Sequence, residues 1–345
     1  MFAKKSPPGV SAAQASDSGA GGGLTQPLAG VAGAGLLFLV AAVALIAVTG
    51  DPQAGAPRVR IPLAVSGLPI PAFGPDSVAA PAAPFAGLPL APAPIVGLTE
   101  PGPGGLLPII ASYGRTPADA YARPFTSGGA PKVALVIGGL GPNSAITRQA
   151  IEQLPPEVTL AFVPYTDGLQ GWVDLARANG HEVLMEMPME PVDYPQNDPG
   201  PYTLMAQDPA QETVKRLEWL LSRATGYFGV TNDLGGRFLA SDPAMATFEA
   251  ALNRRGVAFV DDGSAGARGG GLPRASADRS IDVTLGAAAI DQQLAGLEST
   301  AQQRGGALGS AGAHPVTLQE VKRWAASLGA RGLRLAPASA LTTRR

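Results

Sequence analysis

The chain has 345 residues and no cysteine, which excludes disulfides, thiolate metal sites and a cysteine nucleophile. Its 25 basic and 27 acidic side chains give a formal net charge of -2 without a basic cluster, so we expect no nucleic-acid partner. Residues 1–130 are dominated by Ala, Gly and Pro, whereas the remainder carries most of the charge. Only the second part has the composition of a folded domain.

Residues 28–48, LAGVAGAGLLFLVAAVALIAV, contain no charged side chain. Because about 20 apolar residues suffice for a helix to cross a bilayer, we predict a transmembrane signal anchor there, after a cytoplasmic tail of residues 1–27. A cleaved signal peptide is the competing interpretation. It is disfavoured because the apolar run exceeds the roughly 7 to 15 residues of a signal-peptide core.

Residues 49–96 are rich in Pro, Ala and Gly and are predicted to form a disordered, extended linker. The remaining residues, 97–345, are predicted to form one domain. In that domain short apolar runs alternate with amphipathic stretches, which is typical of βαβ units and of a largely parallel sheet or barrel. Strands are expected at 132–137, 158–163, 181–187, 226–230, 257–260, 281–283, 307–308 and 333–335. Helices are expected at 143–154, 169–179, 209–224, 242–254, 287–303 and 316–328.

The segment 181–201, HEVLMEMPMEPVDYPQNDPGP, is the most informative in the chain. Its apolar first half is predicted to be a strand, which the following prolines end, so its acids gather at the carboxyl end of that strand. In β/α folds this is the end at which ligands bind. A solvated, turn-rich loop is the alternative interpretation.

Several segments in one order resemble the divergent polysaccharide deacetylase family of the bacterial envelope. They are YARPF (121–125), VIGGLG (136–141), TLAFVPY (159–165), GHEVLMEMPMEP (180–191), NDPGP (197–201), GVTNDLGGRF (229–238), FVDDGS (259–264) and AGAHP (311–315). The resemblance spans roughly residues 97–340 and implies an α/β fold, the distorted β/α barrel of carbohydrate esterases. The basic residues on the two sides of the span nearly cancel, so they do not decide its orientation. The resemblance implies an N-terminus in the cytoplasm and a domain in the periplasm.

This chain departs from the family's usual residues at three places, and the departures change the chemistry expected there. The family usually ends its first strand with two aspartates, a catalytic base and a metal ligand, where this chain has Gly138 and Gly139. Glu186 and Asp233 stand where the family has histidines. His314 matches a family histidine that resembles the general acid or its orienting partner. Because a deacetylase of this type needs a divalent metal to polarise the amide and activate water, we expect a protein that binds an envelope glycan with catalysis weak or lost.

The candidate catalytic residues are His314 and Asp233. The candidate substrate-binding residues are Glu190, Asn197, Asp198, Asn232, Arg237, Asp261 and Asp262. We expect no cofactor; the alternative is an active hydrolase with one divalent metal (Mg, Ca, Mn or Zn) on Glu186 and Asp233. A non-enzymatic scaffold acting through the proline-rich arm is a further alternative.

A dinucleotide site after the 132–137 strand is disfavoured. Ser144 replaces the third glycine of the phosphate-binding pattern, and a tight turn explains the remaining glycines. The three tryptophans fall in predicted helices and are interpreted as packing residues. Tyr194 and Tyr202 flank the acidic loop and are better candidates for stacking on a sugar. His181 is expected at the surface or against a helix.

Overall fold

The structure is a computed structural model that describes residues 87–126, 128–266 and 271–344. The predicted tail (1–27), the predicted membrane span (28–48) and the predicted linker up to residue 86 lie outside these residues. In the described ranges, no helix combines the length and the apolar character needed to cross a membrane.

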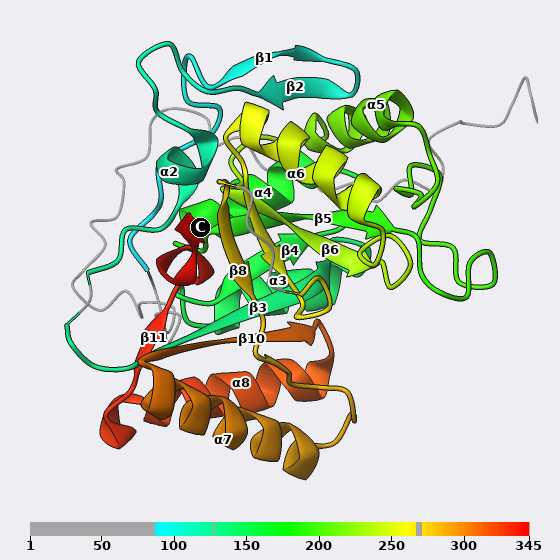
Figure 1. The fold of residues 1–345 in the computed structure, drawn as a ribbon. Coiled ribbons are helices and arrows are strands. Elements are labelled where there is room, and N and C mark those ends of the chain that lie inside the picture. Colours follow the sequence, from blue (N-terminus) through cyan, green and yellow to red (C-terminus); the bar gives the residue numbers. More distant parts are fainter. Residues whose placement is uncertain (1–86, 127, 267–270, 345) are drawn as a thin grey trace, which may run out of the picture. The chain divides into compact units, whose positions relative to one another are not determined.

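The described chain begins with a small hairpin and continues into alternating strands and helices (Figure 1). The first half contains β1 (Thr99–Gly102), β2 (Gly105–Pro108), α2 (Pro117–Tyr121), β3 (Lys132–Leu140), α3 (Ser144–Gln153), β4 (Thr159–Phe162), α4 (Leu169–Ala178), β5 (Val183–Met189) and α5 (Ala210–Leu221). The second half contains β6 (Gly229–Leu234), α6 (Asp242–Arg255), β7 (Ala258–Asp261), β8 (Pro273–Ser276), β9 (Arg279–Ser280), α7 (Ala287–Arg304), β10 (Gly306–Gly312), α8 (Pro315–Ser327), η1 (Gly329–Arg331), β11 (Arg334–Ala336), η2 (Ala338–Leu341) and β12 (Thr343–Arg344).

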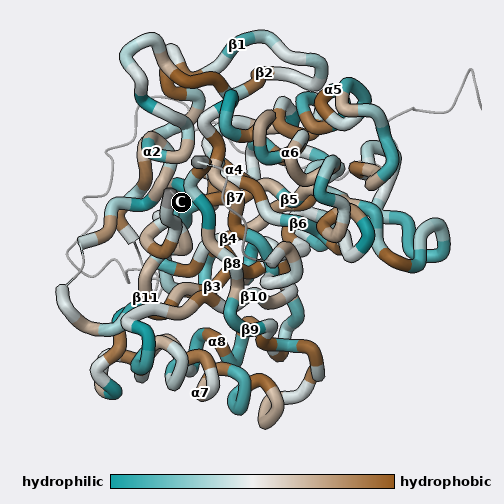
Figure 2. Tube along the Cα trace, in the orientation of Figure 1, coloured by the Kyte–Doolittle hydropathy of each residue, from teal (hydrophilic) through white to brown (hydrophobic). Residues whose placement is uncertain are grey.

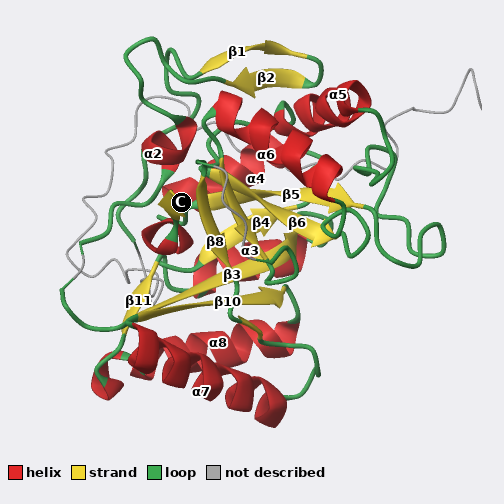
Figure 3. Cartoon of the chain, viewed as in Figure 1, coloured by secondary structure: helices red, strands yellow, loops and turns green. Residues whose placement is uncertain are grey.

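The main sheet has ten strands among the described residues, in the order β12-β8-β7-β6-β5-β4-β3-β10-β9, with β11 also paired to β3. All pairs are parallel except β12 with β8. The sheet curls, and the helices lie around its outer side (Figure 3). No described pairing joins β9 to β12, so the predicted barrel is an open half-barrel. The α/β class and the parallel sheet are as predicted.

Alternation along the strands separates two apolar clusters. On β3, Val133, Leu135 and Ile137 belong to the larger cluster beneath the helices, whereas Ala134 and Val136 belong to a smaller cluster on the other face. This is the two-residue period of a strand with both faces buried. Apolar residues accordingly gather along the central strands (Figure 2). The strands contribute Ala134, Val136, Ala161 and Ala258 to the smaller cluster, so its side chains are mostly small.

The helix boundaries follow local signals close to those predicted. Asn143 caps α3, and its side chain accepts hydrogen bonds from the backbone N–H groups of Ala145 and Ile146. Pro209 precedes the first turn of α5, and Gly256 ends α6 in the left-handed conformation (φ 66°) that glycine adopts without strain.

One predicted strand is wrong. Residues 281–283 are not a strand: Val283 is 80% exposed, and the short strands β8 and β9 precede it instead. His181, expected at the surface or against a helix, is fully buried against α3, with its ring nitrogens 2.8 Å from the Val158 carbonyl oxygen and 3.0 Å from that of Ile151. Burial lowers the pKa of this histidine, which holds the end of α3 against β5.

The last part of the predicted linker, residues 87–96, is packed onto the domain. Arg177, which is buried on α4, donates to the carbonyl oxygens of Ala91, Tyr121 and Gly226 at 2.8 to 3.1 Å. The N–H of Ile95 donates to the Tyr121 hydroxyl. A buried guanidinium needs several carbonyl partners, and residues 87–96 supply one of them. This segment is therefore bound to the domain, whereas the sequence predicted an extended linker up to residue 96.

The C-terminal segment is fixed in a similar way at the opposite end of the sheet from the acidic loops. The fully buried Glu182 carboxylate precedes β5 and accepts hydrogen bonds from the backbone N–H and the hydroxyl of Ser339. Thr159 and the backbone N–H of Arg123 are its other donors. Burial raises the pKa of Glu182, and the hydrogen bonds from Ser339 oppose that shift.

Candidate functional site

The carboxyl ends of β3 and β5 form the centre of the candidate site. Gly138 continues the inner-face series of Ala134 and Val136, and Glu186 follows Leu184 on the inner face of β5. Glu186 Oε1 accepts a 2.6 Å hydrogen bond from the backbone N–H of Gly139. A Cβ atom on Gly138 would lie 2.6 Å from the same oxygen. The Glu186 carboxyl therefore fills the space that a side chain on Gly138 would take, whereas a Cβ atom on Gly139 would meet nothing within 4 Å.

The environment of Glu186 favours its protonated form. The side chain is only 7% exposed, and burial raises its pKa from 4.5 to about 8, with Asp233 adding to the shift and the Gly139 N–H opposing it. Burial, followed by the charge of Asp262, also raises the pKa of Asp233. Neighbouring acids thus add to the effect of burial on Glu186 and on Asp233.

Asp233 and Asp262 are held in place by the side chain of Asn232. In the pairing of β5 with β6, Pro188 lies opposite Asp233, two residues beyond Glu186. Asn232 Nδ2 donates to the Leu234 carbonyl oxygen (2.8 Å), and its Oδ1 accepts from the Asp262 N–H (3.0 Å). Asn232 is buried, and both ends of its amide are used inside the protein. These bonds give Asn232 a structural role in the turn after β6, and its role in substrate binding stays a prediction.

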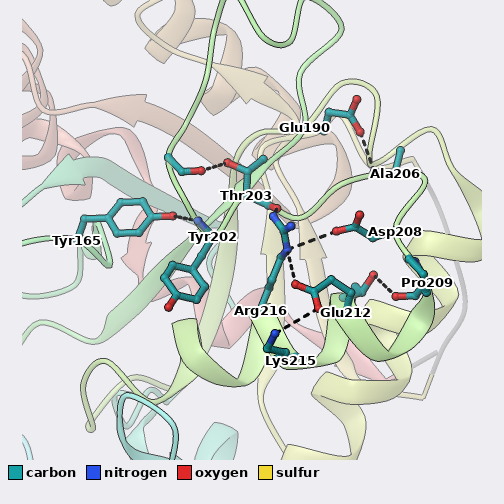
Figure 4. A network of polar contacts seen from close by, with 12 residues as sticks. Tyr165, Glu190, Tyr202, Thr203, Ala206, Asp208, Pro209, Glu212, Lys215 and Arg216 are labelled. Carbon is teal, nitrogen blue, oxygen red and sulfur yellow. Dashed lines mark hydrogen bonds and ion pairs between the residues drawn. The ribbon is translucent and has the colours of Figure 1, made fainter.

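Tyr165 follows β4 and extends the site toward the acidic loop (Figure 4). Its hydroxyl accepts a 3.0 Å hydrogen bond from the backbone N–H of Tyr202. Burial raises its pKa, and the charges of Asp198 and Asp233 add to the shift. The ring of Tyr202 stacks on that of Trp219, with centroids 3.6 Å apart and planes 1° from parallel. One face of the predicted sugar-stacking residue Tyr202 is therefore covered by Trp219, and both rings pack against the larger apolar cluster.

The remaining loop residues that were predicted to bind substrate are on the surface or paired with one another. Asn197 and Asp198 are exposed, and Asp198 Oδ1 accepts from the Gly200 N–H. Glu190 is buried; its Oε1 accepts from Arg237 Nη1 (2.8 Å) and its Oε2 from the Ala206 N–H (2.7 Å). Arg237 also donates to the Val192 carbonyl oxygen. Glu190 and Arg237 thus close the loop that follows β5.

Asp261 is likewise committed to an internal network. Its Oδ2 accepts from the Arg274 guanidinium (3.1 and 3.3 Å) and from the Ser276 hydroxyl (2.6 Å), and its Oδ1 accepts from the Gly263 N–H. It is 1% exposed. Asp261 therefore joins β7 to β8, whereas its neighbour Asp262 lies next to Asp233.

His314 lies at the same edge of the sheet, two residues beyond β10. The pairing of β10 with β3 places Gly312 opposite Gly138, and the imidazole of His314 folds back over Gly312. His314 is the N-cap residue of α8 and is exposed. Asp282, which the sequence analysis did not single out, fixes this turn by accepting from the Gly312 N–H and the Thr317 hydroxyl, both at 2.9 Å.

The contact between Gly138 and Glu186 gives the first testable prediction. In Gly138→Ala the new methyl group displaces the Glu186 carboxyl and breaks its bond to Gly139, so the free energy of unfolding should fall by about 1 to 2 kcal/mol. In a Glu186→Ala background the same change should cost close to nothing. A double-mutant cycle by urea unfolding measures the coupling.

The control for this cycle is Gly171→Ala on α4, where a Cβ atom meets nothing within 4 Å. That change should raise stability by about 0.5 to 1 kcal/mol, the difference in helix propensity between glycine and alanine. Equal costs for Gly138→Ala with and without Glu186 would contradict the contact.

The chain matches the family model of divergent polysaccharide deacetylases over residues 135–342. It belongs to the divergent polysaccharide deacetylase family. A crystal structure of an uncharacterized protein from Agrobacterium tumefaciens C58 is 38% identical, with a TM-score of 0.66, and the match covers 69% of this deacetylase-family chain and 99% of that one. No curated protein matches the chain.

Two deacetylase structures also match, at lower similarity. One is the catalytic domain of a peptidoglycan N-acetylglucosamine deacetylase from Eubacterium rectale ATCC 33656, with 12% identity, a TM-score of 0.43, and coverage of 64% of this chain and 94% of that one. The other is a Bdellovibrio bacteriovorus peptidoglycan deacetylase, with 13% identity, a TM-score of 0.34, and coverage of 73% and 64%. TM-scores this low carry no argument about function.

The donor set of this family member does not fit a resident divalent metal. Among the residues that the structure describes, no three His, Cys, Asp or Glu side chains are grouped so as to hold an ion. One carboxyl oxygen of Glu186 accepts the hydrogen bond from the Gly139 N–H, and burial favours the protonated carboxyl by raising its pKa. Metal ligation, in contrast, needs a deprotonated carboxylate. All three carboxyl groups can instead accept hydrogen bonds, and the protonated Glu186 can also donate one.

Proposed function

We propose that this chain is an inner-membrane protein, anchored by residues 28–48, whose periplasmic domain binds a cell-envelope glycan with hydrolysis weak or lost. Membership of the deacetylase family supports a polysaccharide as the ligand class. The carboxyl edge of the sheet supplies acids and a turn held by the Asn232 amide, which suit the hydroxyl groups of sugars.

The observation that carries the proposal is the Glu186 carboxyl seated over Gly138 and hydrogen-bonded to Gly139. Metal-dependent deacetylation needs a Lewis acid on the amide carbonyl and an activated water. Neither glycine offers a ligand, and Glu186 fills the space. Hydrogen bonding to a sugar needs no metal, so binding survives a change that stops hydrolysis.

The test uses the full chain, recovered from membranes in mild detergent. We expect it in the membrane fraction, and we expect it to sediment with purified peptidoglycan, to carry no stoichiometric divalent ion and to release no acetate from N-acetylated glycan above the blank. Asp262→Ala should weaken sedimentation, whereas Asp291→Asn, on the exposed face of α7, should not.

Each alternative gives a different result. About one ion per chain together with released acetate would establish an active metal-dependent hydrolase. If the protein works as a scaffold, no glycan is retained, and deleting residues 51–86 stops its function while substitutions at the sheet edge do not.

A further inference from the structure

Large apolar side chains are exposed along the first segment that the structure describes, residues 87–118. Nine large apolar side chains are exposed in the described ranges, and five of them lie between residues 88 and 113: Leu88, Val96, Leu106, Ile110 and Tyr113. Val96 is 93% exposed and Tyr113 67% exposed. Apolar side chains gathered in this way on a surface mark a contact with a protein or a membrane.

The same segment carries almost no charge. Residues 87–118 contain one acid, Glu100, and one base, Arg115. Glu100 pairs with Arg255 at the end of α6, so its charge is balanced inside the protein. Arg115 is exposed and makes no ion pair within the part of the chain that the structure describes. The charge that the segment offers to a partner is therefore positive.

Tyr113 lies at the tip of a turn that backbone hydrogen bonds hold closed. The N–H of Ala111 donates to the Arg115 carbonyl oxygen (2.9 Å), and the N–H of Gly114 donates to that of Ala111 (2.8 Å). Ala111 is buried, whereas residues 112–115 are exposed. A tyrosine has an apolar ring and a polar hydroxyl, which suits the boundary between lipid and water. The turn displays this side chain without first having to be ordered.

The exposed segment lies at the amino end of the sheet. Gly87 lies against Pro156 and Asn179, in the turns that lead into β4 and β5. Ile110 lies against Gly256, in the turn that leads into β7. In Figure 1 the arrowheads of β5, β6 and β10 point to one side of the view, and α2 lies on the other side. The described chain therefore begins at the same end as the exposed apolar side chains, opposite the candidate site.

A bilayer is the partner that this placement favours. Residues 49–86 span at most about 130 Å when fully extended, so an anchor at residues 28–48 keeps the segment close to the membrane. Tethering raises the local concentration of the segment at the lipid surface, so a contact that is weak by itself is sufficient. Headgroup phosphates complement Arg115, and the interface accepts the apolar side chains.

We infer that residues 87–118 dock on the lipid surface of the membrane that holds the anchor. Val96 and Tyr113 enter the interface, and Arg115 contacts headgroup phosphates. The carboxyl edge of the sheet then faces away from the bilayer, toward the glycan of the wall. The inference rests on the membrane anchor of the proposed function and does not depend on glycan binding at that edge.

The experiment places the full chain in nanodiscs of phosphatidylethanolamine and phosphatidylglycerol. Because the chain has no cysteine, one fluorophore can be attached at Ser112→Cys in the turn, at Gln196→Cys in the loop after β5, or at Asp291→Cys on α7, all of them exposed positions. Lipids that carry a nitroxide on the acyl chain quench a fluorophore that lies in the interface. We expect quenching at position 112 to exceed that at 196 and 291 by at least about twofold.

Substitutions then test which side chains make the contact. In a chain that carries Val96→Ser and Tyr113→Ser, quenching at position 112 should fall to the level of the other two positions. The matched control, Val283→Ser with Leu285→Ser, removes two exposed apolar side chains from the loop before α7 and should leave the quenching unchanged. All four side chains are more than half exposed, so neither pair of changes removes core packing.

Equal quenching at the three positions, or stronger quenching at 196 or 291, would overturn the inference. Protection of the fluorophore at 112 that depends on protein concentration and not on the nitroxide lipid would also overturn it, in favour of contact with a second copy. A chain that the nanodiscs do not retain would refute the anchor and the inference with it. If the quenching is as expected but peptidoglycan is not bound, the proposed glycan binding falls and lipid docking stands.

Discussion

Replacing Arg177 with alanine is expected to lower the free energy of unfolding by about 3 to 5 kcal/mol. The guanidinium is 2% exposed and donates to three backbone carbonyl groups, those of Ala91, Tyr121 and Gly226. Its removal takes the donor from the buried carbonyl oxygens of Tyr121 and Gly226 and releases Ala91 in the segment before β1. A domain is stable by only about 5 to 15 kcal/mol, so urea unfolding followed by circular dichroism should show a large shift of the midpoint.

The matched control is Arg148→Ala on α3. This arginine is exposed, pairs with Glu152 one turn away and lies over the ring of Trp172. Its loss should cost less than about 1 kcal/mol. If both variants unfolded at the same urea concentration, the bonds of Arg177 would not be what fixes the segment of residues 87–96.

Replacing Glu186 with glutamine is expected to stabilise the protein increasingly as the pH rises. The folded-state pKa of Glu186 is raised from 4.5 to about 8, so its contribution to stability is fully present below pH 4.5 and is lost as the pH rises through 8. Glutamine keeps the shape and the acceptor for Gly139 without this loss. At pH 7 the variant should be more stable by on the order of 2 kcal/mol.

Urea unfolding at pH 4, 5.5, 7 and 8.5 checks this, with the difference between variant and wild type as the measured quantity. The control is Glu152→Gln on the exposed side of α3, which removes a carboxyl group at the surface of the protein. A Glu186→Gln difference that stays constant from pH 4 to 8.5 would show that Glu186 does not hold its proton across this range.

Local pattern was enough to predict most of the sheet and helices, because each strand from β3 to β7 is a buried run of apolar residues between amphipathic helices. It failed at β8, whose sequence PRAS has a proline and little β propensity. There the parallel pairing with β7 and the ion pair of Arg274 with Asp261 form the strand. These are long-range contacts, which a local pattern does not contain.

The candidate site was predicted in part. The order of motifs located Glu186, Asp233 and Asp262 at one edge, since parallel strands end together. The pairing of Glu190 with Arg237 and the bracing by Asn232 depend on where the loops fold, so the sequence could not separate binding residues from structural ones. Tyr165 was visible inside the TLAFVPY motif but was not recognised, because its neighbour Asp233 lies on a different strand.

The bonds between Glu182 and Ser339 bear on how the protein is made. A ribosome adds residue 339 long after β5 has emerged, since the two positions are 157 residues apart. Until then the nascent chain has only Thr159 and Arg123 as donors for an acid that the finished domain buries completely. Burying that acid before residue 339 is present would leave acceptor atoms unpaired at a cost in free energy. The last donors to Glu182 therefore join this network only after the chain has been made as far as residue 339.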